Sequence, residues 1–307
     1  MKAVILVGGE GTRLRPLTCN RPKAMVPVLN TPFLEHVIHH LARHQVREIV
    51  LAMGHLAQPI EGYLGDGSRF GVRLSYVVEE APLGTAGAIK NAEKYLDDTF
   101  LALNGDIFAD LDITAMASFH RQCRAKVTIA LTPVDDPTQY GLVETDERGR
   151  ILRFVEKPSP EEITTNRVNA GTYVIEPDVL AQIPPGTNVS IERETFPRLL
   201  ASGEPVYAYP SSGYWMDTGT PEKYLQLHRD LLSGRSGYYP LAGEVVTGEG
   251  CHIHPSAQIR GPVVIGSNCT IDRDVRIIGP VVIGNGCTVL EGALVGDSVI
   301  WLSLIHI

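Results

Sequence analysis

The chain has 307 residues, a length that suggests about two domains of ordinary size. Apolar residues make up 44% of it and charged residues 20%, which allows a sizeable core and excludes a disordered protein. The formal net charge of −8 argues against general binding of nucleic acid or of an anionic membrane, since both need a broad basic surface. A phosphate ligand would have to be held by a few placed basic residues.

No segment has the pattern of a secretory signal or of a membrane helix. The apolar run 3–7 is short and leads directly into glycines, and no stretch approaches the roughly 20 apolar residues of a membrane helix. Five cysteines, an odd number spread over a long chain, predict no disulfide framework. We therefore expect a reduced, cytoplasmic protein that binds neither membranes nor nucleic acid.

Residues 1–232 alternate apolar, β-rich runs with helical patterns, which predicts an α/β domain with an open, mainly parallel sheet. In such sheets ligands bind at the carboxyl ends of the strands. That rule draws attention to the loop after the first strand and to Asn104-Gly105-Asp106. The predicted strands are 3–7, 48–52, 74–78, 100–103, 126–131 and 172–175, and the predicted helices include 33–44, 87–95 and 113–121.

The pattern changes after residue 232. Residues 233–250 are rich in glycine and are predicted to form a linker, and from 251 to 307 an apolar residue recurs every six positions. A period of six fits neither a helix nor a simple strand and indicates a parallel β-helix of stacked coils. It resembles the left-handed β-helix, with three hexapeptides in each triangular coil and about three coils here. The repeat positions are Ile253, Ile259, Ile265, Ile271, Ile277, Ile283, Val289, Val295, Trp301 and Ile307.

Three cysteines, Cys251, Cys269 and Cys287, recur once per coil. They could form a ladder of metal ligands or a stack of small apolar side chains inside the coil. No histidine or acidic residue recurs beside them at ligand spacing, so we interpret them as an apolar stack.

The hexapeptide region is expected to serve assembly. A β-helix end exposes unpaired backbone unless something covers it, so we predict homo-oligomerisation through this region. The chain stops at Ile307 in register with the repeat and without a capping element, which we interpret as a sign of truncation relative to full-length relatives.

The segment between Gly8 and Lys23 has the composition of a phosphate-binding loop. A buried strand ends, and glycines follow that let several backbone N–H groups approach a ligand. Arg13 adds a forked cation and Lys23 a point charge. The spacing is neither the dinucleotide fingerprint nor a P-loop. A purely structural turn would not require the two cations.

At this point the sequence resembles the sugar-phosphate nucleotidyltransferase family, closest to the branch that joins GTP and mannose 1-phosphate. The signature reads Gly8-Gly9-x-Gly11-Thr12-Arg13-Leu14-x-Pro16-Leu17-Thr18, followed by Pro22-Lys23. Further blocks occur in the family's order at 82–87, 104–106, 140–141, 154–158, 168–171, 190–192 and 215–219. The resemblance implies a Rossmann-like nucleotidyltransferase domain with a mixed, mainly parallel sheet, followed by a short left-handed parallel β-helix.

The resemblance also implies roles for individual residues. Arg13, Lys23, Asp106, Lys157 and Asp217 would be catalytic, with Asp106 and Asp217 holding Mg²⁺. The nucleotide would be bound by Leu6, Gly8, Gly9, Gly11, Thr12, Arg13, Lys23, Gly84, Asn104 and Asp106. The sugar 1-phosphate would be bound by Gly141, Glu156, Lys157, Asn169, Gly171 and Asp217.

Three alternatives stay open at this stage. The substrates could be glucose 1-phosphate with dTTP or UTP, because the thymidylyl and uridylyl relatives share the loop and both aspartates. The chain could be a non-catalytic, nucleotide-sugar-sensing regulatory subunit, although the retained cations and aspartates argue against this. The β-helix could itself be an acyltransferase, for which about three coils are short.

Overall fold

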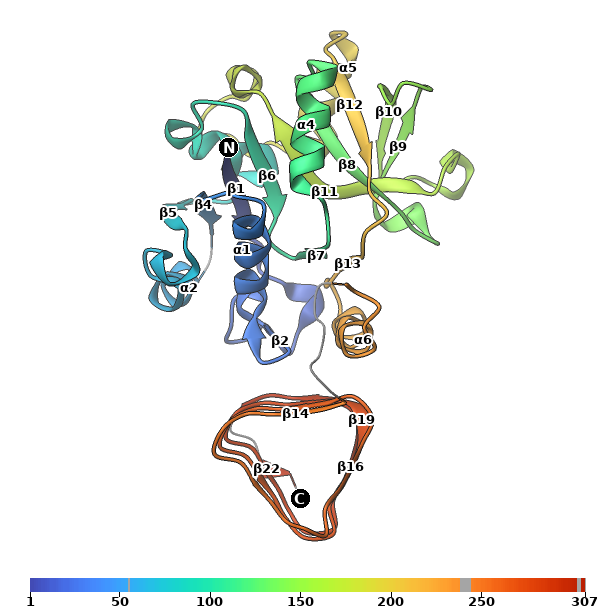
Figure 1. The fold of residues 1–307 in the computed structure, drawn as a ribbon. Coiled ribbons are helices and arrows are strands. Elements are labelled where there is room, and N and C mark those ends of the chain that lie inside the picture. Colours follow the sequence, from blue (N-terminus) through green and yellow to red (C-terminus); the bar gives the residue numbers. More distant parts are fainter. Residues whose placement is uncertain (55, 238–243, 303–304, 307) are drawn as a thin grey trace. The chain divides into compact units, whose positions relative to one another are not determined.

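The structure is a computed structural model that describes residues 1–54, 56–237, 244–302 and 305–306 (Figure 1). The chain forms two compact units. Unit 1 comprises Met1–Glu10, Asn20–Ala24 and Val37–Trp215, and unit 2 comprises Gly11–Cys19, Met25–His36 and Met216–Ile307. The division predicted from the sequence, into 1–232, 233–250 and 251–307, follows the change of pattern and stays a prediction.

Unit 1 is built on a nine-stranded mixed sheet with the order β10-β9-β11-β6-β1-β4-β5, in which β8 also pairs with β11 and with β12. Neighbours from β6 to β5 are parallel, as are β8 and β12, whereas β11 is antiparallel to β6, β8 and β9. The strands are β1 (Lys2–Val7), β4 (Glu48–Met53), β5 (Arg73–Val78), β6 (Phe100–Asn104), β8 (Val127–Pro133), β9 (Gly141–Thr145), β10 (Ile151–Glu156), β11 (Arg167–Ile175) and β12 (Val206–Pro210).

All six predicted strands are confirmed. Their apolar runs are continuous because the sheet is covered on both faces, and Ala3, Val4 and Ile5 in β1 are all fully buried. The strands β9, β10 and β12 were not predicted. In β10 Ile151 is the one buried residue and Leu152 is exposed, so its apolar pattern is weaker than that of the central strands.

The helices of the sheet domain follow the predicted pattern in part. The predicted helices 33–44 and 113–121 correspond to α1 (Phe33–Arg43) and α4 (Ile113–Cys123), and α4 lies along β8 and β12 (Figure 1). The predicted helix 87–95 is in fact α3 (Gly84–Asn91) followed by a short 3-10 helix (Glu93–Tyr95). The helices α2 (Ala57–Leu64), α5 (Phe196–Ala201) and α6 (Pro221–Leu232) were not predicted.

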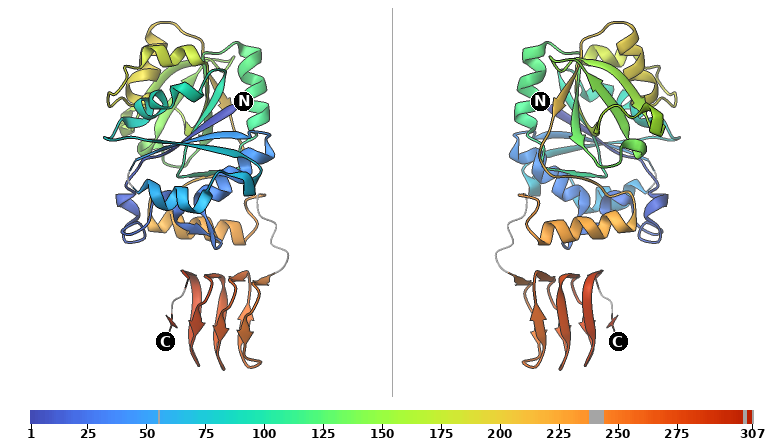
Figure 2. Two further views of the ribbon diagram at one scale, coloured as in Figure 1. Left: turned by 90° about the vertical axis from the view of Figure 1, so that its left-hand side faces the viewer. Right: turned by 90° about the vertical axis from the view of Figure 1, so that its right-hand side faces the viewer.

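The hexapeptide region of unit 2 consists of short parallel strands, and residues 18 apart pair with each other, as Val245, Val263 and Val281 do. Seen end-on in Figure 1 the coils superimpose as a triangle, and Figure 2 shows them stacked. This is the arrangement of a left-handed β-helix. The strands are β14 (Val245–Thr247), β15 (His252–Ile253), β16 (Gln258–Arg260), β17 (Val263–Ile265), β18 (Thr270–Ile271), β19 (Arg276–Ile283), β20 (Thr288–Val289), β21 (Leu294–Ile300) and β22 (Ile305–His306).

The first coil begins inside the predicted linker. Because β14 pairs with β17, Gly248 and Gly250 lie within the stacked coils. Gly250 has a positive φ of 70°, and a Cβ there would stand 2.4 Å from the side chain of Asn268 on the next coil. These glycines mark turns of the coil. Pro240 and Gly243, which also belong to the predicted linker, lie outside the described residues.

The repeat of six is interrupted in the third coil. The 18-residue register holds as far as Gly296. After that, Val281 pairs with Ser298, one residue earlier than this register predicts. The third coil turns this corner with Asp297 alone, where the second coil uses the two residues 279–280. One residue is therefore missing from the corner, and every later position is shifted.

The shift corrects one predicted repeat position. Ile300, not Trp301, pairs with Ile283 and is buried in the core of the coils. Trp301 leaves the repeat, and its indole N–H donates a hydrogen bond to the hydroxyl of Tyr224 in α6, at 3.1 Å. The last predicted position, Ile307, lies outside the described residues.

The cysteine stack is confirmed as part of the packed interior. Cys269 and Cys287 are fully buried in the apolar core of the coils, and Cys251 packs against it. Each thiol lies 3.0 to 3.1 Å from a backbone carbonyl of the neighbouring coil, those of Gly266, Gly284 and Trp301 respectively. A thiol that donates to a carbonyl within a core is a structural group.

Unit 2 also joins α6 to a small hairpin of β2 (Pro27–Val28) and β3 (Thr31–Pro32). The hydroxyl of Tyr224 donates to the carbonyl of Pro27, and the imidazole of His228 accepts the N–H of Leu29 at 3.3 Å. These contacts anchor α6 on the hairpin. None of the helices in the described part of the chain has the length and apolar character needed to cross a membrane.

Candidate active site

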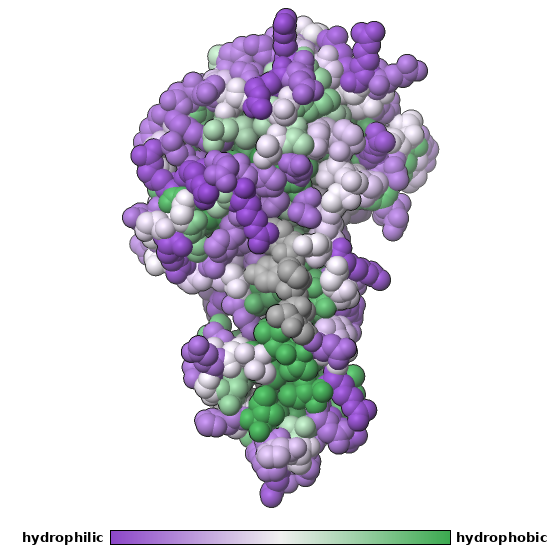
Figure 3. Space-filling model, in the orientation of Figure 1, coloured by the Kyte–Doolittle hydropathy of each residue, from purple (hydrophilic) through white to green (hydrophobic). Residues whose placement is uncertain are grey.

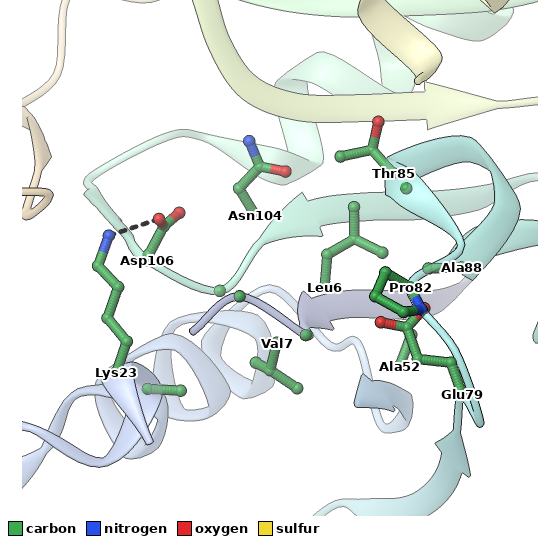
Figure 4. A pocket seen from close by; sticks show the side chains of 15 residues that line it. Leu6, Val7, Lys23, Ala52, Glu79, Pro82, Thr85, Ala88, Asn104 and Asp106 are labelled. Atoms are coloured by element: carbon green, nitrogen blue, oxygen red, sulfur yellow. Dashed lines mark hydrogen bonds and ion pairs between the residues drawn. The ribbon is translucent and has the colours of Figure 1, made fainter. Parts of the chain in front are cut away.

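A cavity of about 360 Å³ opens in unit 1 at the carboxyl ends of β1, β4 and β6 (Figure 4). This is where open α/β sheets bind ligands. Seven of the ten residues predicted to bind the nucleotide line it: Leu6, Gly8, Gly9, Lys23, Gly84, Asn104 and Asp106. The remaining lining residues are Val7, Ala24, Ala52, Glu79, Pro82, Thr85, Ala88 and Gly105.

Gly105 allows the loop after β6 to lie directly on the end of β1. Its N–H donates to the carbonyl of Leu6 at 2.9 Å, and a Cβ there would stand 2.5 Å from Val7 Cγ1. A side chain at this position would push the two loops apart. The close approach places Asp106 beside the glycine loop.

Lys23 and Asp106 form an ion pair at one side of the cavity, with Nζ 2.6 Å from Oδ2 (Figure 4). The lysine side chain is 10% exposed and the aspartate side chain 38% exposed. The carboxylate holds the ammonium group against the cavity wall, where it can meet an anionic ligand. The aspartate is accessible enough to bind a cation as well.

Glu79 lies at the opposite side of the cavity from this ion pair (Figure 4). Its Oε2 accepts the N–H of Leu83 at 3.1 Å, and a Cβ on Gly8 would stand 2.9 Å from Oε1. Glu79 was not predicted to be a site residue. A signal was available, since Glu79 directly follows β5 at its carboxyl end and precedes the 82–87 block.

The glycines of the 82–87 block are needed for close packing. Gly84 has a φ of 68°, and a Cβ there would stand 2.6 Å from the carbonyl oxygen of Val189. A Cβ on Gly87 would stand 2.5 Å from the carbonyl oxygen of Thr187. The N–H of Ala86 donates to the Val189 carbonyl at 2.9 Å. The first turn of α3, which forms a wall of the cavity, is therefore built directly on residues 187–189.

Five of the six residues predicted to bind the sugar 1-phosphate, all except Asp217, also belong to unit 1. Gly141 and Glu156 are paired in β9 and β10, and a Cβ on Gly141 would stand 2.9 Å from the Glu156 carboxylate. Burial raises the pKa of Glu156, and the charge of Glu192 raises it further, whereas Lys157 acts in the opposite direction. Lys157 has a positive φ of 54° and its N–H donates to the carbonyl of Tyr140.

Gly171 brings this second group of residues next to the cavity. It has a φ of 70°, and a Cβ there would stand 2.8 Å from Asn104 Nδ2, which lines the cavity. Gly171 lies in a bulge of β11 between Asn169 and Tyr173. The amide of Asn169 spans this bulge, because Oδ1 accepts the Gly171 N–H at 2.9 Å and Nδ2 donates to the Tyr173 hydroxyl at 2.8 Å.

Two aromatic residues beside the bulge were not assigned a role from the sequence. Trp215 donates its indole N–H to the carbonyl of Ala170 at 3.1 Å. The rings of Tyr140 and Trp215 pack edge to face, with 5.3 Å between their centroids. They form an apolar surface next to the predicted sugar-binding residues, of the kind that sugar rings pack against.

Gly11, Thr12, Arg13 and Asp217 belong to unit 2. There, Arg13 and Asp217 both flank Gly219, since a Cβ on Gly219 would stand 3.1 Å from Arg13 Nη2 and 3.1 Å from Asp217 Oδ1. Lys223 Nζ lies 3.7 Å from the Asp217 carboxylate. The structure thus brings Arg13 together with Asp217, and Lys23 together with Asp106.

The two predicted metal ligands, Asp106 and Asp217, belong to different units. Within the described ranges, no group of three or more histidine, cysteine, aspartate or glutamate side chains is arranged to hold a metal ion. Mg²⁺ commonly binds only one or two protein carboxylates and keeps several waters. Two aspartates are therefore enough, in number and in ligand type, for a Mg²⁺ site.

Comparison with known proteins gives two family matches. Residues 2–234 match the nucleotidyl transferase family, and residues 244–272 and 262–297 match the bacterial transferase hexapeptide repeat. Mannose-1-phosphate guanylyltransferase of Mycobacterium tuberculosis is 42% identical over 260 residues, covering 83% of this chain and 72% of that protein. UTP–glucose-1-phosphate uridylyltransferase of Synechocystis is 39% identical over 247 residues, covering 76% of this chain and 64% of that protein.

Among solved structures, HddC from Yersinia pseudotuberculosis has a similar fold. The TM-score is 0.65 at 30% sequence identity, with 74% of this chain and 97% of that chain covered.

Proposed function

The chain belongs to the nucleotidyl transferase family, and on that basis we propose that it transfers a guanylyl group from GTP to mannose 1-phosphate and releases pyrophosphate. The observation that carries this proposal is the cavity at the carboxyl ends of β1 and β6. It joins a glycine loop, suited to phosphate oxygens, with the Lys23–Asp106 ion pair.

In the proposed reaction, a phosphate oxygen of mannose 1-phosphate attacks the α-phosphorus of GTP. A new P–O bond forms, the bond from the α-phosphorus to the bridging oxygen breaks, and pyrophosphate leaves with that electron pair. Such a transfer needs alignment and charge stabilisation more than covalent help from the protein. Lys23 and Arg13 would hold the triphosphate and stabilise the leaving pyrophosphate, and Lys157 would hold the sugar's phosphate.

The carboxylates of Asp106 and Asp217 would hold a Mg²⁺ ion. Asp106 suits this role because its carboxylate borders the cavity and its side chain is 38% exposed. The ion would neutralise charge on the triphosphate and on the departing pyrophosphate. Asp106 would also keep the ammonium group of Lys23 at the cavity wall, through the ion pair already formed.

Glu79 supports guanine as the base. Guanine presents two neighbouring donors, N1–H and the N2 amino group, which a carboxylate can accept together. Uracil and thymine present one N–H between two carbonyl oxygens, which a carboxylate would repel. Glu79 brings a carboxylate into the cavity opposite the ion pair, so this wall is chemically matched to guanine.

A turnover matrix tests the proposal. GTP, ATP, UTP and dTTP are each paired with mannose, glucose and N-acetylglucosamine 1-phosphates in the presence of Mg²⁺, and pyrophosphate release is followed. We expect GTP with mannose 1-phosphate to give the highest kcat/KM, and Glu79→Gln to reduce the preference for GTP over UTP. A maximum at UTP or dTTP with glucose 1-phosphate would instead favour the uridylyl or thymidylyl function, for which the Synechocystis relative is the precedent.

We further propose that the hexapeptide region mediates homo-oligomerisation. Several exposed large apolar side chains belong to this region. Figure 3, which draws one face of the molecule, shows an apolar area on the hexapeptide region. Exposed apolar patches often mark interaction sites. A monomer in light scattering at micromolar concentration would contradict this assignment. The exposed large apolar side chains of the hexapeptide region are Val245, Ile253, Ile278, Leu294 and Leu302.

A further inference from the structure

Three hydrogen bonds converge on the carboxylate of Glu192, which lies in a π-helical turn over Ile191–Thr195. The hydroxyls of Thr85 and Ser190 donate to Oε2 at 2.7 and 2.8 Å, and the hydroxyl of Tyr173 donates to Oε1 at 3.3 Å. An ionised carboxylate is the group that can accept all three at once. Glu192 has no role in the function proposed above.

One side of this carboxylate reaches the nucleotide cavity. Thr85 lines the cavity from the first turn of α3, and its Oγ1 both donates to Glu192 and accepts the N–H of Ile191 at 2.8 Å. The backbone bond from Ala86 to Val189 runs beside these contacts. The position of the cavity wall therefore depends on where the turn holds Glu192.

The other side reaches the bulge of β11. Tyr173 is fully buried, and its hydroxyl accepts from Asn169 Nδ2 while it donates to Glu192. Burial and the charge of Glu192 raise the pKa of Tyr173 well above its ordinary value, so the hydroxyl stays protonated and remains a donor. Asn169 in turn fixes the N–H of Gly171. An unbroken chain of hydrogen bonds thus runs from the cavity wall to the predicted sugar-binding bulge.

We propose that Glu192 is a positioning residue that couples the two substrate pockets. It holds Thr85 at the nucleotide cavity and, through Tyr173, holds Asn169 at the sugar 1-phosphate side. This inference rests on the proposed function, which assigns a sugar 1-phosphate to the residues around the bulge. Because one half-buried carboxylate fixes both walls, filling one pocket favours the arrangement that the other needs, and each substrate binds more tightly when its partner is present.

Glu192 also acts on Glu156 through its charge. Burial and the Glu192 carboxylate both raise the pKa of Glu156, and Lys157 and Arg193 lower it. If the charge at Glu192 is removed, the pKa of Glu156 falls and Glu156 becomes ionised at lower pH. The acidic limb of the pH profile for sugar 1-phosphate use then moves to lower pH, a response that a purely structural role of Glu192 would not produce.

The experiment is the steady-state kinetics of Glu192→Gln. Glutamine keeps the shape but offers a single acceptor oxygen to three donors. We expect the KM for mannose 1-phosphate to rise about tenfold, as for the loss of one hydrogen bond to a charged group. In the wild type the apparent KM for mannose 1-phosphate should fall as GTP approaches saturation. In the variant this dependence should largely disappear, and the acidic limb of kcat/KM should shift to lower pH.

Two further variants make the result specific. Glu194→Gln alters an exposed carboxylate in the same turn, one that accepts the Ser190 N–H at 3.0 Å, and should behave as the wild type. Tyr173→Phe removes only the hydroxyl in the middle of the chain and should raise the KM for mannose 1-phosphate while sparing that for GTP. Thermal melting of each variant checks that it is folded.

The outcomes separate this proposal from the function on which it rests. Absence of wild-type turnover with every triphosphate and sugar 1-phosphate pair would refute the proposed function. Wild-type turnover together with an unchanged KM, GTP dependence and pH profile in Glu192→Gln would refute the coupling alone. An equal effect of Glu194→Gln would also refute it, because the change would then reflect general damage to the turn.

Discussion

The sheet of unit 1 and the coils of the hexapeptide region both bury apolar side chains, but they differ in where polar groups can be placed. In the coils, Ile265, Ile271 and Ile277 follow one another at the repeat spacing, and each is almost completely buried. In the sheet, buried strands end in loops that carry Lys23, Glu79 and Asp106 into one cavity. A regular stack leaves its polar side chains dispersed over the outer surface, whereas the end of an open sheet gathers them.

The same comparison shows what irregularities do. The bulge of β11 takes Gly171 out of the regular pairing with β8, and Asn169 at its edge accepts the Gly171 N–H. In the coils, the corner at Asp297 is one residue shorter than the same corner of the second coil. This shift takes Trp301 out of the repeat, and its indole donates a hydrogen bond to Tyr224. In both regions the residues that make specific polar contacts stand where the regular pattern fails.

The largest effect is expected in the sheet domain. Asp106→Asn removes the charge that holds Lys23 and that would bind Mg²⁺, so kcat should fall by about 100-fold or more while the melting temperature stays near that of the wild type. Pyrophosphate release and thermal melting measure the two quantities. Asp135→Asn, at an exposed position, is the matched control and should turn over normally. Near-normal turnover of Asp106→Asn would remove this residue from the mechanism.

The coils should respond in the opposite way. Ile277→Ala creates a cavity in a fully buried position of the stack and should lower the free energy of unfolding by about 3 kcal/mol. Because no residue assigned to the reaction lies in the coils, kcat at 25 °C should be unchanged. Urea unfolding and initial rates test this. A large loss of kcat in the folded variant would show that the coils support the active site directly.

A third prediction concerns the anchoring of α6 in unit 2. Burial lowers the pKa of His228 to about 4, and the neighbouring His36 adds to the effect. The unfolded chain therefore binds more protons between pH 6.5 and 4. The free energy of unfolding should fall by about 1.4 kcal/mol for each unit that the pH is lowered through this range. Unfolding curves measured from pH 7 to pH 4 would give this slope.

The variant His228→Gln identifies the source of that slope. Glutamine can still accept the N–H of Leu29 but does not titrate, so stability should fall at pH 7 and depend less steeply on pH below 6.5. Burial also lowers the pKa values of His40 and His120, which act in the same direction in unit 1. An unchanged slope in the variant would assign the whole effect to those two residues.

The smallest effect is expected from Trp301→Phe. Phenylalanine keeps an aromatic ring but loses the N–H that donates to Tyr224, so the free energy of unfolding should fall by about 1 kcal/mol. Differential scanning calorimetry would measure this change. Trp301 is displaced from the repeat, so the variant should be clearly more stable than Ile277→Ala. Equal destabilisation by the two would indicate that Trp301 packs as a core residue after all.

Local sequence determined much of this protein. The central strands could be predicted from their apolar runs, because both faces of the sheet are covered. The coils could be predicted from the period of six, because each turn must present the same side to the interior. The glycine loop, Lys23 and Asp106 could be selected because cations and carboxylates beside glycines are typical of phosphate sites. The family resemblance supplied the partners for these residues.

Only the tertiary structure decided which distant residues meet. Thr85 and Glu192 are 107 residues apart in the chain, and nothing local indicates that they share a hydrogen bond. Glu79 could be placed opposite Lys23 only once β4 and β5 had joined the sheet. The displacement of Trp301 depends on a corner that is one residue shorter than in the coil before it, which the six-residue periodicity of the sequence does not reveal. The local sequence pattern determines the secondary structure of a residue and which side of its element is buried. Contacts between elements depend on how the whole chain packs.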